Sequence, residues 1–165
     1  LYLGRVLRQQ GIRQGEPFIA VHPWSSNPLK RWPGERYRTL MRLIAERLST
    51  RIVVIGGPEE ARATHALLPE VVGVVNLVGR LTLRQLAALL QCARVLISND
   101  SGPVHLAAAV GTPTLALFGS TTAATSPKRW GPWGAGHRVI WRPSMEAIAV
   151  EEVFTALQDL VQRLR

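Results

Sequence analysis

Short, continuous apolar runs alternate along the chain with longer stretches in which apolar residues recur at helical spacing. The apolar runs predict strands buried on both faces, because a strand with one solvated face alternates apolar and polar residues. Five such runs occupy residues 17–23, 51–57, 73–79, 94–98 and 112–119, and residues 137–141 are a sixth candidate. Strand and helix in turn, with short connections, indicate parallel βαβ units.

The stretches between the runs predict amphipathic helices. In residues 35–49 the apolar side chains Tyr37, Leu40 and Ile44 fall on one helical face. Thr82 is a cap for a helix predicted over residues 82–93. Gly111 ends the helix that begins near Gly102. Further helices are predicted over 58–68 and 150–164. The sequence therefore predicts an α/β fold, a doubly wound and mainly parallel Rossmann-like sheet covered by helices on both faces.

Composition agrees with one globular domain. The chain has 165 residues, of which 47% are hydrophobic and 19% are charged. No apolar run reaches the ~18 residues that a membrane-spanning helix needs. Cys92 is the sole cysteine, which excludes an internal disulfide and fits a reducing cytosol. Its helical context predicts a small buried hydrophobe.

The charge is strongly basic. Twenty Lys and Arg residues against eleven Asp and Glu residues give a net charge of +9 and a pI near 11.3. Such a balance favours anionic partners, which include phosphate-bearing ligands, an anionic membrane surface and nucleic acid. The arginines are scattered along amphipathic helices, a spacing that is typical of a solvated face.

Most of the unusual polar residues follow the predicted strands. Ligands of open α/β sheets bind outside the carboxyl ends of the strands, so these positions are candidates for a site. They lie in 22–30, 56–60, 79–82, 99–105 and 119–122. The Trp-, Pro- and Gly-rich stretch 127–137 is the one long loop, and its aromatic residues predict an ordered loop.

The junction "SNDSGPVHLAAAVGTP", residues 98–113, carries the most specific chemistry. Ser101 and Gly102 open a helix directly after a strand, where free N–H groups and the helix dipole favour an anion. Asp100 at the strand tip can accept hydrogen bonds from hydroxyls, and His105 lies one turn into the helix. This set suits a phosphate attached to a polyol, as in a sugar nucleotide. The alternative is that Asp100 caps the helix and His105 is a packing residue.

The segment "SNDSGPVHLAAAVGTPTLALFGSTT" resembles glycosyltransferase family 9, the ADP-heptose:lipopolysaccharide heptosyltransferases. "HPWSSNPLKRWPGERYRTL", "VIGGPEE" and "NLVGRLTLRQLAALLQCARVLISND" resemble the same family, in the same order, so the resemblance covers residues 17–142. It implies a GT-B fold, in which two Rossmann-like domains face each other. Residues 15–165 are then the C-terminal nucleotide-sugar-binding domain, and residues 1–14 are the tail of the interdomain connection. The N-terminal acceptor domain with its catalytic Asp lies outside this chain, so the chain alone is expected to be inactive.

The resemblance also implies roles for individual residues. Lys30 lies where a lysine binds the diphosphate and stabilises the leaving group, and the alternative is a surface cation beside a solvent-facing Arg31. Glu60 lies where an acid holds the ribose, with Glu59 as a one-residue alternative. The remaining positions are Ser25, Ser26, Ser101 and Gly102 for the diphosphate, Asp100 and His105 for the sugar and phosphate, and Leu81 for the base. Two departures from the family are a 24–30 loop that is one residue longer and Ala123 in place of a proline.

The implied reaction transfers a glycosyl group from a nucleotide diphosphate sugar, with inversion at the anomeric carbon. By family default the donor is ADP-heptose, and the acceptor is a lipid-linked saccharide of the lipopolysaccharide core. The implied location is the cytoplasm, including the inner face of the inner membrane. No metal or cofactor is expected, because Lys30 and the helix start can offset the diphosphate charge.

Two rival classes stay open. The first is a GT-B epimerase of sugar nucleotides, which needs further catalytic carboxylates and histidines. The second is a basic, non-enzymatic nucleic-acid-binding domain, although the chain lacks RNP-type aromatic residues and a basic helix. No nucleic-acid partner is therefore expected.

Overall fold

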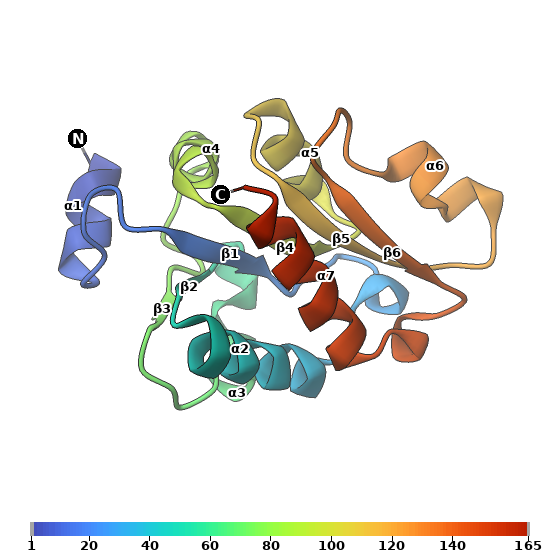
Figure 1. Cartoon of the computed structure of the whole chain (residues 1–165), viewed down its shortest axis with the longest axis horizontal. Coiled ribbons are helices and arrows are strands. Elements are labelled where there is room, and N and C mark those ends of the chain that lie inside the picture. Colours follow the sequence, from blue (N-terminus) through green and yellow to red (C-terminus); the bar gives the residue numbers. More distant parts are fainter. Residues whose placement is uncertain (1, 165) are drawn as a thin grey trace.

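A computed structural model describes residues 2–164 and contains one six-stranded sheet (Figure 1). Its strand order is β3-β2-β1-β4-β5-β6, and all neighbouring strands are parallel. The strands are β1 (Phe18–His22), β2 (Arg51–Val54), β3 (Val74–Asn76), β4 (Val95–Asn99), β5 (Thr114–Gly119) and β6 (Arg138–Arg142). The predicted parallel α/β sheet is confirmed, including its sixth strand.

Helices cover both faces of the sheet. They are α1 (Tyr2–Gln9), α2 (Gly34–Leu48), α3 (Ala61–Leu67), α4 (Leu83–Cys92), α5 (Gly102–Ala109), α6 (Pro127–Trp130) and α7 (Val150–Gln162). In Figure 1, α4 and α5 lie on one side of the sheet, and α2 and α3 lie on the other. Alternate residues of each strand face the two sides: Ile19 belongs to the core under α2 and α7, whereas Phe18 belongs to the core under α4. Both faces of the sheet are buried at β1, β4 and β5, which explains the continuous apolar runs of these strands. Among the described helices, none combines the length and the apolarity needed to cross a bilayer.

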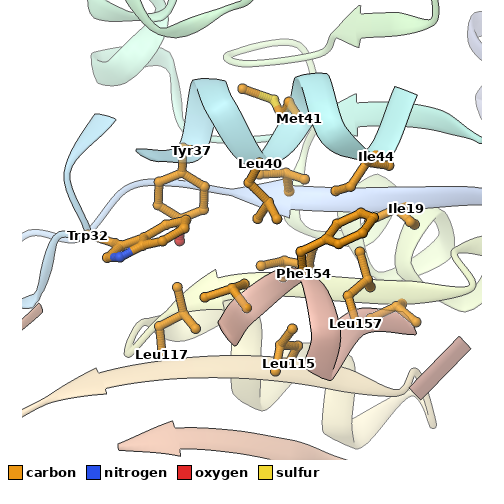
Figure 2. Close-up of a cluster of buried hydrophobic side chains, with 14 of the residues drawn as sticks. Ile19, Trp32, Tyr37, Leu40, Met41, Ile44, Leu115, Leu117, Phe154 and Leu157 are labelled. Atoms are coloured by element: carbon orange, nitrogen blue, oxygen red, sulfur yellow. The ribbon is translucent and has the colours of Figure 1, made fainter. Parts of the chain in front are cut away.

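The larger core lies between the sheet, α2 and α7 (Figure 2). Leu40 and Ile44 of α2 and Phe154 and Leu157 of α7 point toward each other over the strands. Trp32, just before α2, is 1% exposed and packs edge-to-face on Tyr37, with ring centroids 4.9 Å apart. The chain that follows β1 is therefore anchored in the core immediately after it has passed the carboxyl edge of the sheet.

Two helix boundaries follow their predicted chemistry. The Thr82 hydroxyl accepts a hydrogen bond from the Gln85 amide, and the Gln85 side chain accepts one from the Thr82 amide, which completes a capping box at the start of α4. Gly111 has φ +80° after the end of α5, a conformation that favours glycine.

The prediction that Cys92 is buried is wrong, because this residue is exposed. The buried side of α4 is formed by Leu89 and Leu90 and continues to Ala93 after the helix. Cys92 lies between these positions along the chain, and the helical spacing therefore turns its side chain away from the core.

Candidate functional site

A cavity of about 420 Å³ lies at the carboxyl ends of β1, β2 and β4. Eight of the nine predicted site residues line this cavity: Ser25, Ser26, Lys30, Glu60, Asp100, Ser101, Gly102 and His105. His22, Asn27, Pro103 and Trp130 complete the lining. Of the two acids considered for the ribose, Glu60 is the one that reaches this cavity. Leu81 does not line it and packs, partly buried, against the core under α4.

Asn99 explains why a buried strand ends in two polar residues. Its side-chain oxygen accepts hydrogen bonds from the Trp32 amide at 3.1 Å and from the Tyr37 hydroxyl at 2.8 Å. Its side-chain nitrogen donates to the Pro23 carbonyl at 2.9 Å. Asn99 is fully buried, so it ties both ends of the 23–32 loop to the tip of β4. Burial also raises the pKa of Tyr37 well above its ordinary value, which keeps this hydroxyl protonated as a donor.

His22 lies in the candidate range 22–30, but the sequence assigned it no role. Its Nδ1 lies 3.2 Å from the Ser98 hydroxyl and 3.1 Å from the Ser101 hydroxyl. The side chain is buried, and burial lowers its pKa to about 4, so the imidazole is neutral at pH 7. His22 thereby holds Ser101, the residue that precedes the first turn of α5. The sequence signal that could have indicated this role is a single histidine at the end of an otherwise apolar run.

At the start of α5 the Ser101 and Gly102 amides face the cavity, whereas Pro103 has no N–H and the Val104 amide donates to the Ser101 carbonyl at 3.1 Å. Ser101 precedes the helix in an extended conformation, and in this described segment no side chain caps the first turn. A Cβ atom at Gly102 would meet nothing within 4 Å, so open space lies in front of the helix end. This geometry is that of an anion site. Asp100 does not cap the helix, and His105 is exposed on the cavity wall instead of packed in the core.

Lys30 and Asp100 form an ion pair inside the cavity. The Lys30 ammonium lies 2.5 Å from the Asp100 carboxylate, and the side chains are 27% and 8% exposed. Lys30 ends a short 3₁₀ turn, Pro28–Lys30, which the Asn27 side chain caps by accepting a hydrogen bond from the Leu29 amide at 3.0 Å. The pair therefore offers one cation and one hydroxyl acceptor at the same point.

The expectation that Arg31 simply points to solvent needs correction. Its Nε donates a 2.6 Å hydrogen bond to the Ser25 carbonyl, although the side chain is exposed. Arg31 thus braces the loop that carries Ser25 and Ser26. The contact joins residues six positions apart across a turn, and no local sequence pattern predicts it.

A second cavity of about 300 Å³ lies beside the first and shares Asn27, Lys30 and Asp100 with it. It extends to the carboxyl ends of β5 and β6, where its walls carry hydroxyl groups and one further acid: Ser120, Thr121, Thr122, Thr125, Ser144 and Glu146. The Thr122 and Thr125 hydroxyls lie 2.7 Å apart. The Glu146 pKa is lowered by hydrogen bonds from its own backbone amide and from Ser144, and by the Arg36 charge. Hydroxyls and a charged carboxylate over the buried Phe118 form a polar pocket with an apolar floor.

The parallel sheet and the cavity at its carboxyl edge place the chain among the Rossmann-like α/β domains. Sequence comparison is more specific. The profile of the family described as "Glycosyltransferase family 9 (heptosyltransferase)" matches residues 5–156. The chain belongs to this glycosyltransferase family.

Known members of the family are similar along most of the chain. It is 29% identical over 143 residues to lipopolysaccharide heptosyltransferase 3 of Escherichia coli, which covers 83% of this chain and 39% of that protein. The solved E. coli ADP-heptose lipopolysaccharide heptosyltransferase II superposes with a TM-score of 0.82 at 27% identity, covering 98% of this chain and 51% of that one. The chain thus spans about two fifths of the curated relative and corresponds to one half of the solved GT-B enzyme.

The epimerase alternative has support from the fold alone. The UDP-GlcNAc 2-epimerase of Neisseria meningitidis superposes with a TM-score of 0.69 at 14% identity, covering 98% of this chain and 40% of that one. A likeness at this identity reflects the shared Rossmann-like architecture. The family match separates the chain from this second class of enzyme.

Proposed function

We propose that this chain is the donor-binding half of an inverting glycosyltransferase that uses a nucleotide diphosphate sugar. The observation that carries the proposal is the meeting of Lys30, Asp100 and the open start of α5 in one cavity. A cation and free N–H groups suit a diphosphate, and a carboxylate beside them suits sugar hydroxyls. The donor is ADP-heptose, which the name of a structural relative includes, and the acceptor is a lipid-linked saccharide of the lipopolysaccharide core.

The strand order supports an extended donor along the sheet edge. Leu81 follows β3, Glu60 follows β2, the 23–30 loop follows β1, and Asp100 follows β4. These strands are neighbours in that order, so a base at Leu81, a ribose at Glu60 and a diphosphate at α5 would form one continuous path. With strands about 4.8 Å apart, the path from β3 to β5 spans roughly 19 Å. The glycosyl group would then enter the second cavity, beyond the Lys30–Asp100 pair.

The chain's own part in the reaction is electrostatic. The Lys30 ammonium and the N–H groups of α5 would stabilise the negative charge that develops on the departing nucleotide diphosphate. Because these groups are already in place, little reorganisation accompanies bond cleavage. We infer that residues 15–165 form the donor domain, that 1–14 connect it to an N-terminal acceptor domain, and that this domain supplies the base that activates the acceptor. The isolated chain should therefore bind donor and transfer nothing.

Calorimetric titration tests the diphosphate assignment. Lys30→Ala should weaken ADP binding by about one to two orders of magnitude, because a hydrogen bond to a charged group contributes roughly 1.5–3 kcal/mol. Adenosine binding should change little, since adenosine has no phosphate. Arg42→Ala is the matched control, because Arg42 is an exposed cation of α2 that lines neither cavity.

Three outcomes would contradict the proposal. An equal loss in Lys30→Ala and Arg42→Ala would show a general charge effect. A parallel loss of adenosine affinity would place Lys30 away from the phosphates. Binding of single-stranded DNA with strong salt dependence, in the absence of ADP binding, would favour the nucleic-acid-binding alternative.

A further inference from the structure

The β6 end of the sheet carries exposed tryptophans that the donor site does not account for. Trp133 is 89% exposed, Trp130 43% and Trp141 40%, and Val139 is exposed as well. These four are half of the eight large hydrophobic side chains that are exposed among the described residues. Single exposed apolar residues are ordinary, but a concentration on one segment marks a surface of interaction. We call these four residues the tryptophan surface.

The tryptophan surface is held in place by its own hydrogen bonds. The Trp130 indole donates to the Ala124 carbonyl at 2.8 Å, and the Trp141 indole donates to the Ser120 carbonyl at 2.9 Å. A His137 ring nitrogen lies 3.0 Å from the Trp133 carbonyl oxygen. Because the two indole N–H groups are satisfied internally, these rings offer mainly their apolar edges to a partner. The predicted 127–137 loop begins with the short helix α6, and these hydrogen bonds hold its tryptophans in place.

The sheet leaves this surface uncovered for a simple reason. Along β6, Arg138, Ile140 and Arg142 face α7, where Ile140 enters the core and the arginines pair with Asp159 and Glu152. Val139 and Trp141 point to the opposite face. There α5 packs over β5 through Val104, Ala116 and Phe118, whereas Val139 and Trp141 of β6 stay exposed. Figure 1 shows the short α6 beside this edge of the sheet.

The charge of the segment has one sign. Residues 120–142 contain two unpaired cations, Lys128 and Arg129, and no Asp or Glu. Among residues 2–164, neither cation has a carboxylate partner. Arg129 lies over the Trp130 ring at 5.4 Å, which places a cation directly beside an aromatic side chain. The segment therefore combines exposed tryptophans with positive charge that no carboxylate offsets.

We propose that the tryptophan surface, with Lys128 and Arg129, docks this chain on an anionic lipid bilayer. Indole rings prefer the headgroup region of a membrane, and lysine or arginine beside them is attracted to anionic lipid. A single-stranded nucleic acid would need a groove that follows its backbone, whereas Trp133 projects from a loop. The inference rests on this surface and not on the assigned sugar nucleotide. Trp130 also lines the first cavity, so docking would bring the cavity close to the membrane.

Co-sedimentation with vesicles tests the proposal. The chain should bind vesicles that contain about a quarter phosphatidylglycerol and should not bind pure phosphatidylcholine. Lys128→Glu/Arg129→Glu should lower the partition coefficient at least about thirtyfold, because two attracted cations are lost and two repelled anions are added. The control is Arg42→Glu/Arg84→Glu, which changes the net charge equally at two exposed positions on α2 and α4 and should have less than about a threefold effect.

A second pair of variants tests how much the exposed apolar side chains contribute to vesicle binding. Trp133→Ala should lower partitioning roughly tenfold, whereas Leu83→Ala, at a position that is 72% exposed on α4, should leave it unchanged. Vesicles should also shift the tryptophan emission to the blue, and Trp133→Phe should remove most of that shift. ADP binding should persist in both the Trp133 and the Lys128/Arg129 variants, because these side chains do not line the cavity.

Two results would overturn the proposal. Equal losses in the two charge-reversal variants would show that the overall positive field, and not this surface, attracts the vesicles. Binding to single-stranded DNA that falls with Lys128→Glu/Arg129→Glu, while vesicle binding does not, would identify a nucleic-acid surface instead.

Discussion

Asn99 and Asp100 are adjacent in the sequence but do different work. Asn99 is buried and ties the 23–32 loop to β4, whereas Asp100 turns into the cavity and pairs with Lys30. A strand that ended in two apolar residues could do neither. The polar end of β4 is thus explained by one residue that builds the site and one that faces it.

The ion pair makes the effect of removing Asp100 depend on the ligand. Asp100→Ala should weaken binding of the intact nucleotide sugar by about tenfold or more, because sugar hydroxyls would lose a charged acceptor. Free ADP should bind as well as before or better, because Lys30 would no longer be shared with a carboxylate. Titration of both ligands measures the difference. Equal losses of affinity for ADP and for the nucleotide sugar would show that Asp100 does not bind the sugar.

The neutral His22 predicts a specific pH dependence of stability. The pKa of His22 is lowered from 6.5 to about 4 in the folded chain, so the unfolded chain takes up this proton first as the pH falls. The free energy of unfolding should therefore hold its full value above about pH 7 and should fall between pH 6.5 and 4, by about 3 kcal/mol in total.

Urea denaturation at several pH values measures this loss. His22→Asn cannot titrate and should lack this part of the pH dependence, while His65→Asn, at an exposed position, should retain it. If both variants show the same pH profile as the parent chain, His22 is not held neutral by burial.

At the scale of elements, the strands and helices were predictable because each has its own local pattern. The apolar runs predicted the strands to within a few residues, and Thr82 and Gly111 predicted two helix ends. The candidate residues could be predicted to lie together because parallel strands deliver their carboxyl ends to one edge of the sheet. The contacts of His22 and Arg31 could not be predicted, because each joins residues that only the folded chain brings together.

The 23–32 loop offers a test of how an element positions the site. Asn99→Ala would leave the Trp32 amide, the Tyr37 hydroxyl and the Pro23 carbonyl without their partner. We expect a loss of about 2–3 kcal/mol in stability and, with it, a clear loss of ADP affinity, because Lys30 lies on this loop. Chemical denaturation and calorimetry give both values.

Thr112→Val is the matched control for the loop. Thr112 is equally buried and donates a 2.7 Å hydrogen bond to the Leu90 carbonyl, but it lies at the amino end of β5. This variant should lose stability and keep its ADP affinity. Loss of ADP affinity in Thr112→Val alone, or in neither variant, would separate the loop from the site.

At the scale of the whole molecule, the sheet has a complete core of its own. Both faces are covered by helices, and the central strands of the sheet are fully buried. The chain nevertheless spans about two fifths of a curated relative. Composition and periodicity gave the architecture of this unit, but they carry no information about a facing domain. Only the resemblance to a family pointed to one.

If Lys30 and Asp100 have the proposed roles, their pairing also has a kinetic consequence for the transfer reaction. While a glycosylated nucleotide is bound, the carboxylate can hold hydroxyls and the ammonium can hold phosphate, so both charges have external partners. Once the sugar has left, the carboxylate has lost its partner and can compete with the phosphates for the ammonium. The spent nucleotide would then be held less tightly than the donor, which would limit product inhibition. In Asp100→Ala this internal competitor is gone, and ADP should dissociate more slowly.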